Sequence, residues 1–240
     1  MNIRVKIIRI IISLNEKIFF YPKLKKAYKK LSLSRSLIIL DIGSNRGQSI
    51  DFFTKNFNVK KITGFEPNKK LFNSLIKKYK AHQNIEILNR AISSKEDKII
   101  FYENILDETS TLEKINQNSK YLARKAKILG TTAKDLFINK YYVECISLNQ
   151  FLTTNKIKKV DILKVDVEGH EYKVLKGLFS RKNNNINYIQ LESHDDDMYL
   201  NKYKEIDEIL LSNNFSLCKS INHGFGEFKE LIYVNKFFKS

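Results

Sequence analysis

The sequence predicts a doubly wound α/β fold, in which helices cover both faces of a mostly parallel sheet. An apolar run over residues 37–42 is typical of a strand that is buried on both faces. Strands and helices alternate after residue 36, and 240 residues are enough for one such core but few for two domains. Acidic residues follow three of the expected strands, at the edge of the sheet where folds of this kind bind their ligands.

The expected elements follow in order along the chain. The first strand (residues 37–43) and the second (61–67) are each followed by an amphipathic helix. Residues 98–103 and 141–148 are expected to form an antiparallel pair, separated by a polar, partly helical insert at about 104–140 that can shape a substrate pocket. The remaining strands are expected at residues 85–92, 160–169, 186–193, 215–221 and 230–237.

Residues 1–35 form a basic, amphipathic N-terminal segment ahead of the domain at 36–240. They hold ten Lys or Arg and one acid, a net +9 of the chain's +17. The apolar run at residues 10–12 is too short to span a bilayer, and no small-residue cleavage site follows it. We expect a helix that packs on the domain through its isoleucines. The alternative is peripheral docking of residues 1–30 on an anionic membrane surface.

The number and spacing of the cysteines indicate the redox environment in which the protein is expected to work. Cys145 and Cys218 are the only cysteines, and their separation fits neither a zinc motif nor a disulfide framework. A reducing, cytoplasmic location is therefore expected, at the inner membrane face if the N-terminal segment docks there. The sequence does not indicate an oligomeric state.

The high positive charge raises the hypothesis of a nucleic-acid partner. Of the 43 basic residues, 36 are lysine, whereas arginine is the residue that favours bidentate recognition of phosphate and guanine. More than half of the excess charge also lies before the first strand. A nucleic-acid partner is therefore not expected.

The turn after the first strand, Asp41-Ile-Gly-Ser-Asn-Arg-Gly47, is the first motif that carries chemistry. Its spacing excludes a P-loop, and it lacks the third glycine of a dinucleotide-binding turn. The remaining pattern, D-x-G-x-N-x-G, is similar to the first motif of class I methyltransferases, which bind S-adenosylmethionine. In that motif Gly43 and Gly47 would let the backbone approach the methionine and ribose parts of the cofactor. Asp41 would reach its methionine ammonium group, and Asn45 belongs to the same cofactor-binding turn.

Two further positions fit the same cofactor. Glu66 ends the second strand, 19 residues beyond Gly47, where an acid can accept both ribose hydroxyls. Asn89 follows the third strand, where such folds usually meet the adenine. We therefore expect S-adenosylmethionine to bind at the carboxyl ends of the first three strands.

The later run D-V-E-G-H-E-x-x-V-L-K-G, from Asp166 to Gly177, narrows the family. Together with the glycine turn, F-E-P-N and I-Q-L-E, it resembles the FkbM-type methyltransferases over roughly residues 37–238. The resemblance implies the class I methyltransferase (Rossmann-like) fold, with a doubly wound, mostly parallel seven-stranded sheet. It also implies methyl transfer to a hydroxyl oxygen of a sugar, glycan or secondary metabolite. The long, lysine-rich insert departs from the family pattern, so the identity of the methyl acceptor is not determined by the resemblance.

Methyl transfer requires that the acceptor be aligned and its proton be removed. Asp166 ends one core strand, His170 follows it, and Glu192 ends the neighbouring strand. We expect Asp166 to orient the acceptor or donor, and His170 or Glu192 to take the proton. Some small-molecule O-methyltransferases hold magnesium with acids at these two strand ends, so a magnesium ion at Asp166 and Glu192 is the alternative to a site without metal.

Two rival functions belong to other classes. A nucleic-acid amine or cytosine-carbon methyltransferase is excluded, because Pro22 and Pro67 are the only prolines and neither forms the required N-P-P-[YF] or Pro-Cys motif. RNA ribose methylation is not excluded by that argument. The second rival is a non-catalytic, cofactor-binding protein, which the acids at both strand ends disfavour.

Overall fold

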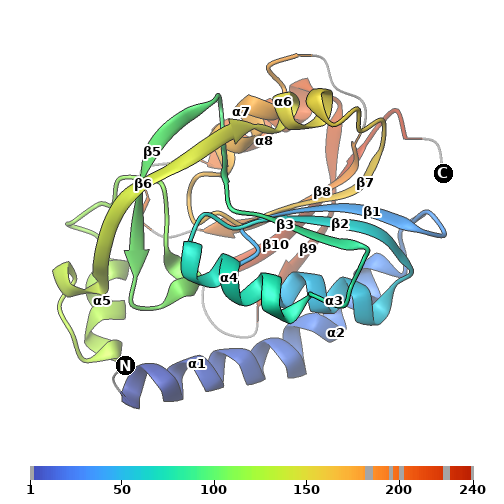
Figure 1. Cartoon of the computed structure of the whole chain (residues 1–240). Coiled ribbons are helices and arrows are strands. Elements are labelled where there is room, and N and C mark those ends of the chain that lie inside the picture. The colour runs from blue at the N-terminus through green and yellow to red at the C-terminus, as the bar shows by residue number, and fades with distance from the viewer. Residues whose placement is uncertain (1–2, 182–185, 195–196, 200–202, 224–227, 239–240) are drawn as a thin grey trace.

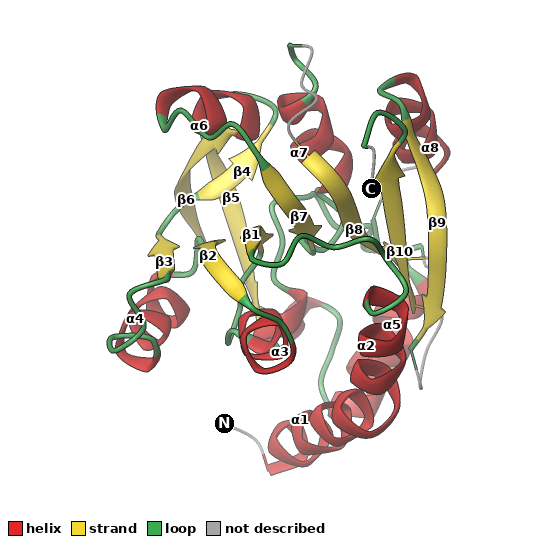
Figure 2. Cartoon of the chain, turned by 90° about the vertical axis from the view of Figure 1, so that its right-hand side faces the viewer, coloured by secondary structure: helices red, strands yellow, loops and turns green. Residues whose placement is uncertain are grey.

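The computed structural model describes residues 3–181, 186–194, 197–199, 203–223 and 228–238. Its central sheet has seven strands in the order β3-β2-β1-β7-β8-β10-β9 (Figure 2). Within the described residues, β10 alone runs antiparallel to its neighbours, so the predicted mostly parallel sheet is confirmed. The strands are β1 (Leu37–Ile42), β2 (Val59–Phe65), β3 (Ile85–Leu88), β7 (Val160–Val165), β8 (Ile186–His194), β9 (Phe215–Asn222) and β10 (Phe228–Asn235).

Helices cover both faces of this sheet, as Figure 2 shows. One face packs against α2 (Tyr21–Tyr28), α3 (Gln48–Asn56) and α4 (Lys69–Lys78). The other packs against α6 (Leu148–Thr154), α7 (Glu171–Leu178) and α8 (Tyr203–Ser212). Strand β1 contributes to both cores, because Ile39 faces one and Leu40 the other. This explains its uninterrupted apolar sequence.

A second, three-stranded sheet lies beside the first, in the order β4-β6-β5 (Figure 1). The expected antiparallel pair is present as β5 (Asp97–Asn104) and β6 (Phe137–Ser147). The expected strand at 85–92 is instead split, and its second half, β4 (Ala91–Ser93), pairs with β6. Asn89 explains the break, because its side-chain amide turns back to donate to the carbonyl oxygens of Glu66 and Pro67.

The insert between β5 and β6 is partly helical. It contains the short turns η2 (Asp107–Thr109) and η3 (Lys134–Leu136) and the helix α5 (Lys120–Leu129). Ser119 caps α5 by accepting a hydrogen bond from the Leu122 amide, and Gly130 ends it in a left-handed conformation.

The N-terminal segment is helical and joins the domain along its length. It comprises α1 (Ile3–Asn15), a π-helical turn η1 (Glu16–Phe20) and α2. Phe20, Leu24 and Tyr28 are buried in the same core as α3 and β1. The expectation that α1 packs through its isoleucines is wrong for most of them, because α1 buries Val5 while its other face stays exposed. Among the described residues, no helix has the length and apolar character that crossing a bilayer requires.

Candidate active site

The predicted cofactor-binding turn lies at the carboxyl end of β1, beside the end of β2. Glu66 is buried, and its two carboxylate oxygens accept hydrogen bonds from the backbone N–H of Asn45 at 2.7 Å and of Asn68 at 2.8 Å. Burial raises the pKa of Glu66 from 4.5 to about 8, against the opposing effect of these two bonds. The Asn45 side-chain oxygen Oδ1 is buried without a hydrogen-bond partner in this pocket. Glu66 and Asn45 thus offer acceptor positions to a ligand with hydroxyl or amine groups.

The two glycines of the turn are required by the packing of the protein itself, which the sequence alone does not reveal. Gly43 and Gly47 both have left-handed backbone, with φ of +87° and +81°. A Cβ at Gly43 would lie 1.9 Å from the carbonyl oxygen of Asp166, and one at Gly47 would lie 2.2 Å from the Tyr79 hydroxyl. These glycines therefore allow close contact within the protein. Gly43 also lines the pocket, whereas Gly47 does not.

Two other residues expected to touch the cofactor lie behind the pocket wall. Asp41 is fully buried on β1 and does not line the pocket. Burial raises its pKa, and the neighbouring Lys164 opposes that shift. Asn89 holds the loop that carries Glu66, and the pocket is lined instead by the next residues, Arg90 and Ala91. Asp41 and Asn89 therefore do not line the pocket in this structure, and contact of either residue with the cofactor stays a prediction.

The other half of the pocket lies beyond β7, β8 and β10 and includes Asp166 and Glu192, as predicted. Lys164 is buried, and its Nζ lies 2.8 Å from Asp166 Oδ2. The strand order places β7 beside β8, so the two predicted acids meet at one edge of the sheet. Their convergence was the prediction from sequence, and the geometry agrees with it.

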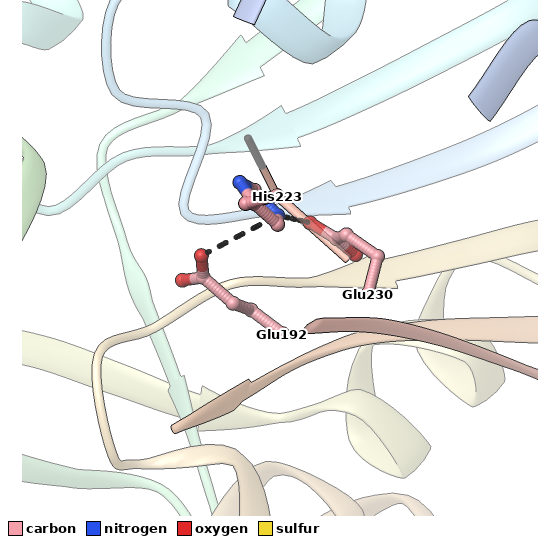
Figure 3. Close-up of side chains that lie close together, drawn as sticks. All are labelled: Glu192, His223 and Glu230. Atoms are coloured by element: carbon pink, nitrogen blue, oxygen red, sulfur yellow. Dashed lines mark ion pairs between the residues drawn. The ribbon is translucent and has the colours of Figure 1, made fainter. Parts of the chain in front are cut away.

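His223 and Glu230 join this group from the C-terminal strands. Figure 3 shows His223 between two carboxylates, with its Nε2 3.9 Å from Glu192 Oε1 and 3.8 Å from Glu230 Oε1. Burial alone lowers the pKa of His223, but Glu230, Glu192 and Asp166 outweigh that effect and raise it. Glu230 also accepts a 2.8 Å hydrogen bond from the Gln190 side chain. His223 therefore lies among carboxylates that favour its protonated form.

The N-terminal segment forms part of the pocket wall, and no pattern in the sequence predicts this. Glu16, Phe20, Tyr21 and Leu24 all line it. The Phe20 ring stacks on His223 with a centroid separation of 4.0 Å. Burial raises the pKa of Glu16 to about 7; His223 opposes this shift, and Asp166 and Glu192 add to it. The π-helical turn η1 carries both Glu16 and Phe20 into the site.

His170 is the clearest departure from the predicted site. Its side chain is completely buried and is not among the residues that line the pocket. Nδ1 lies 2.6 Å from Glu113 Oε1, and Nε2 lies 2.9 Å from Ser93 Oγ. Both ring nitrogens are engaged, so His170 links α7 to β4 and the insert. Neither ring nitrogen is therefore available to take a proton from a methyl acceptor bound in the pocket.

Carboxylates dominate the pocket. Eight acidic side chains line it, against two Lys or Arg and one histidine. Two groups have ligand atoms within 4.8 Å of one another, as a metal site would require: Glu192 with His223 and Glu230, and Asp166 with Glu168 and Glu192. In the group of Glu192, His223 and Glu230, the histidine lies between the two carboxylates. In the other group, Lys164 already forms an ion pair with Asp166. The eight acids are Glu16, Glu66, Asp107, Glu108, Asp166, Glu168, Glu192 and Glu230.

Comparison with known proteins identifies the family. The model of the methyltransferase FkbM domain matches residues 41–217. The chain belongs to the FkbM methyltransferase family. S-adenosylmethionine is accordingly the expected cofactor of this FkbM domain. No match is found among curated proteins.

Solved structures agree with the fold. A methyltransferase FkbM from Methylobacillus flagellatus KT has a TM-score of 0.53 and 12% identity, covering 86% of this chain. The match spans 45% of that protein, so this chain corresponds to less than half of it. Magnesium protoporphyrin IX methyltransferase from Synechocystis PCC 6803, solved with bound S-adenosylmethionine, has a TM-score of 0.52 at 15% identity over 98% of this chain and 85% of its own. A methyltransferase from Aquifex aeolicus has a TM-score of 0.50 at 13% identity, with 98% of both chains covered. The fold is therefore that of class I methyltransferases, as predicted.

Proposed function

We propose that this protein methylates a hydroxyl oxygen of a sugar-like acceptor, such as a glycan or a polyhydroxylated metabolite. Membership of the FkbM family supports methyl transfer. The class of methyl acceptor is inferred from the second half of the pocket, where Asp166, Glu192 and Glu230 converge with Glu16. Carboxylates accept hydrogen bonds from hydroxyl groups, so an acceptor rich in hydroxyls satisfies them.

The first half of the pocket suits S-adenosylmethionine. The unpartnered Asn45 Oδ1 and the Glu66 carboxylate, each oxygen of which has one N–H donor, leave acceptor capacity for ribose hydroxyls. When bound, the cofactor supplies a methyl group on a sulfonium, which passes to the acceptor oxygen and leaves S-adenosylhomocysteine. Glu66 and Asn45 fix where that donor lies relative to the acids of the second half.

In the second half, Asp166 and Glu192 have distinct roles. Lys164 holds the Asp166 carboxylate from behind, so Asp166 orients the acceptor by accepting a hydrogen bond from one of its hydroxyls. Glu192 takes the proton of the reacting hydroxyl as the oxygen gains its methyl group. When protonated, His223 beside Glu192 compensates the charge of this group before the proton arrives.

The rival functions make different demands on the pocket. RNA ribose methylation would bring phosphates into a pocket lined by acidic side chains, and those that are charged repel them. Magnesium catalysis would require an ion to compete with Lys164 and His223 for the same carboxylates. A non-catalytic protein would bind cofactor without transferring its methyl group. The first argument favours an acceptor that brings no phosphate into the second half of the pocket, and the second favours a metal-independent reaction.

The test measures transfer of a labelled methyl group from S-adenosylmethionine to a panel of sugars, sugar nucleotides and glycans, with RNA as the competing acceptor. Glu192→Gln is expected to lower turnover roughly a hundred- to ten-thousand-fold while binding of S-adenosylhomocysteine persists. The matched control is Glu86→Gln, a surface acid that pairs with Lys61. A chelator is expected to leave the wild-type rate unchanged. Methylation of RNA alone, or cofactor binding with no transfer to any acceptor, would refute the proposal.

A further inference from the structure

The outer face of α1 is the most apolar exposed surface in the described part of the chain. Eight of the fifteen large hydrophobic side chains that are exposed there belong to residues 3–19. Six of these lie on α1: Ile12 is 39% exposed, and the other five, Ile3, Ile7, Ile10, Ile11 and Leu14, are 50–72% exposed. Their spacing of four, three, one and three residues places them on one face of the helix. An uninterrupted aliphatic stripe in water calls for a partner.

The opposite face of α1 is fixed to the protein, so the stripe is held in one orientation. Val5 is fully buried in a cluster with Leu122 and Leu129 of α5. Arg9 donates to the carbonyl oxygen of Ile105 and forms ion pairs with Asp107 and Glu108. In Figure 1, α1 lies along the lower edge of the molecule, outside the helices that cover the sheet.

Charge identifies the partner. Within described residues 3–30, the exposed cations are Arg4, Lys6, Lys17, Lys23, Lys26, Lys29 and Lys30. Glu16 is the one acid in this stretch, and it is half-buried where it lines the pocket. Lys6 falls on one flank of the aliphatic stripe and Arg4 on the other, as 100° per residue requires, and Lys17 follows in η1. An aliphatic stripe with basic flanks matches the acyl and headgroup layers of an anionic membrane.

We propose that α1 docks this protein on an anionic membrane surface, with its aliphatic stripe inserted at the headgroup boundary and the basic side chains of Arg4, Lys6 and Lys17 on the lipid phosphates. The segment that docks continues directly into η1, which carries Glu16 and Phe20 in the pocket wall. Docking therefore places one wall of the active site next to the membrane. The proposal does not depend on the identity of the methyl acceptor.

The experiment is co-sedimentation of the full chain with vesicles of phosphatidylglycerol and phosphatidylcholine, compared with phosphatidylcholine alone. Wild type is expected to bind the anionic vesicles and to be released by high salt, which screens surface charge. Ile7→Glu with Ile10→Glu is expected to reduce binding more than about tenfold. Lys6→Gln and Lys17→Gln are each expected to reduce it by about fivefold.

The matched control is Leu211→Glu with Leu217→Glu, two equally exposed side chains on α8 and β9, with the same chemistry and the same charge change. It is expected to bind vesicles as wild type does. Amide exchange of the wild type should slow over residues 3–19 when anionic vesicles are added, a measurement that needs no variant. Absence of vesicle binding by wild type, equal loss in both double variants, or a stripe that instead buries itself in a dimer by light scattering would overturn the proposal.

Discussion

At the scale of single residues, Glu66 determines how cofactor binding depends on protons. Its pKa of about 8 in the free protein means that it is largely protonated at pH 7. Ribose hydroxyls that donate to the carboxylate stabilise its charged form and lower that pKa. We predict that S-adenosylhomocysteine binding at pH 7 releases a proton. The binding heat should therefore differ between buffers of different ionisation enthalpy, and Glu66→Gln should abolish the difference. Identical wild-type heats in both buffers would contradict this.

Glu16 should govern how turnover depends on pH. Its pKa of about 7 makes it neutral in acid and charged above neutrality. A negative charge there raises the proton affinity of the neighbouring Glu192 and strengthens it as a base. We predict that kcat/KM rises as pH increases through about 7 and that Glu16→Gln flattens this limb. The profile of Glu86→Gln should match wild type. If kcat/KM for methyl transfer by the wild type does not change between pH 6 and 8, Glu16 has no part in the mechanism.

His170 is predicted to matter for stability and not for chemistry. His170→Ala leaves Ser93 without its partner and removes one of the two partners of Glu113, the other being Lys173. Each buried polar group left unpaired costs about 1–3 kcal/mol. Thermal denaturation should show a clear loss of stability, whereas turnover per folded molecule should stay at the wild-type level. A large loss of turnover without a loss of stability would restore His170 as a catalytic candidate.

At the scale of elements, the sequence predicted what local patterns determine. The sequence correctly predicts the turn between β1 and α3, Glu66 at the end of β2, Asp166 after β7 and Glu192 near the end of β8. Each of them lies at or near a strand end with a recognisable apolar run. His223 and Glu230 were missed, since their approach to Glu192 depends on β10 pairing antiparallel with β8. The split of the expected strand at 85–92 was missed because it depends on hydrogen bonds between Asn89 and a loop 22 residues away.

The turn itself offers a prediction with an internal control. Gly43→Ala places a Cβ 1.9 Å from a backbone carbonyl at φ +87°, so both the strain and the clash must be relieved by moving β7. The strained backbone alone costs about 1–3 kcal/mol. Gly130→Ala also has positive φ, but its Cβ would meet the mobile end of the Arg4 side chain at 2.8 Å. Chemical denaturation should therefore show a larger loss for Gly43→Ala. If both variants lose the same free energy of unfolding, the backbone at Asp166 moves away from the new Cβ at little cost.

At the scale of the whole molecule, charge is divided between surface and pocket. The chain carries +17 overall, yet its pocket is lined by eight acids. Net charge alone therefore misleads about the acceptor, because the basic residues act at the outer surface. The N-terminal segment joins the two regions, with exposed lysines on one side and Glu16 on the other. Its amphipathic pattern was visible in the sequence, but its place in the pocket depended on the packing of Phe20, Leu24 and Tyr28.

Two truncations should separate the parts of this segment. Deletion of residues 1–33 removes Phe20, Leu24 and Tyr28 from the core, and the last also donates to Gln190 at 2.5 Å. Three buried side chains of this size contribute about 5–9 kcal/mol, which is comparable to the whole stability of a domain. This deletion should unfold the protein or greatly lower its melting temperature. Deletion of residues 1–14 ends before η1 and keeps the pocket wall, so it should still bind S-adenosylhomocysteine while losing vesicle binding. If the longer deletion melts like wild type, the N-terminal segment is only a surface addition, and its contribution to the pocket is not needed for the fold.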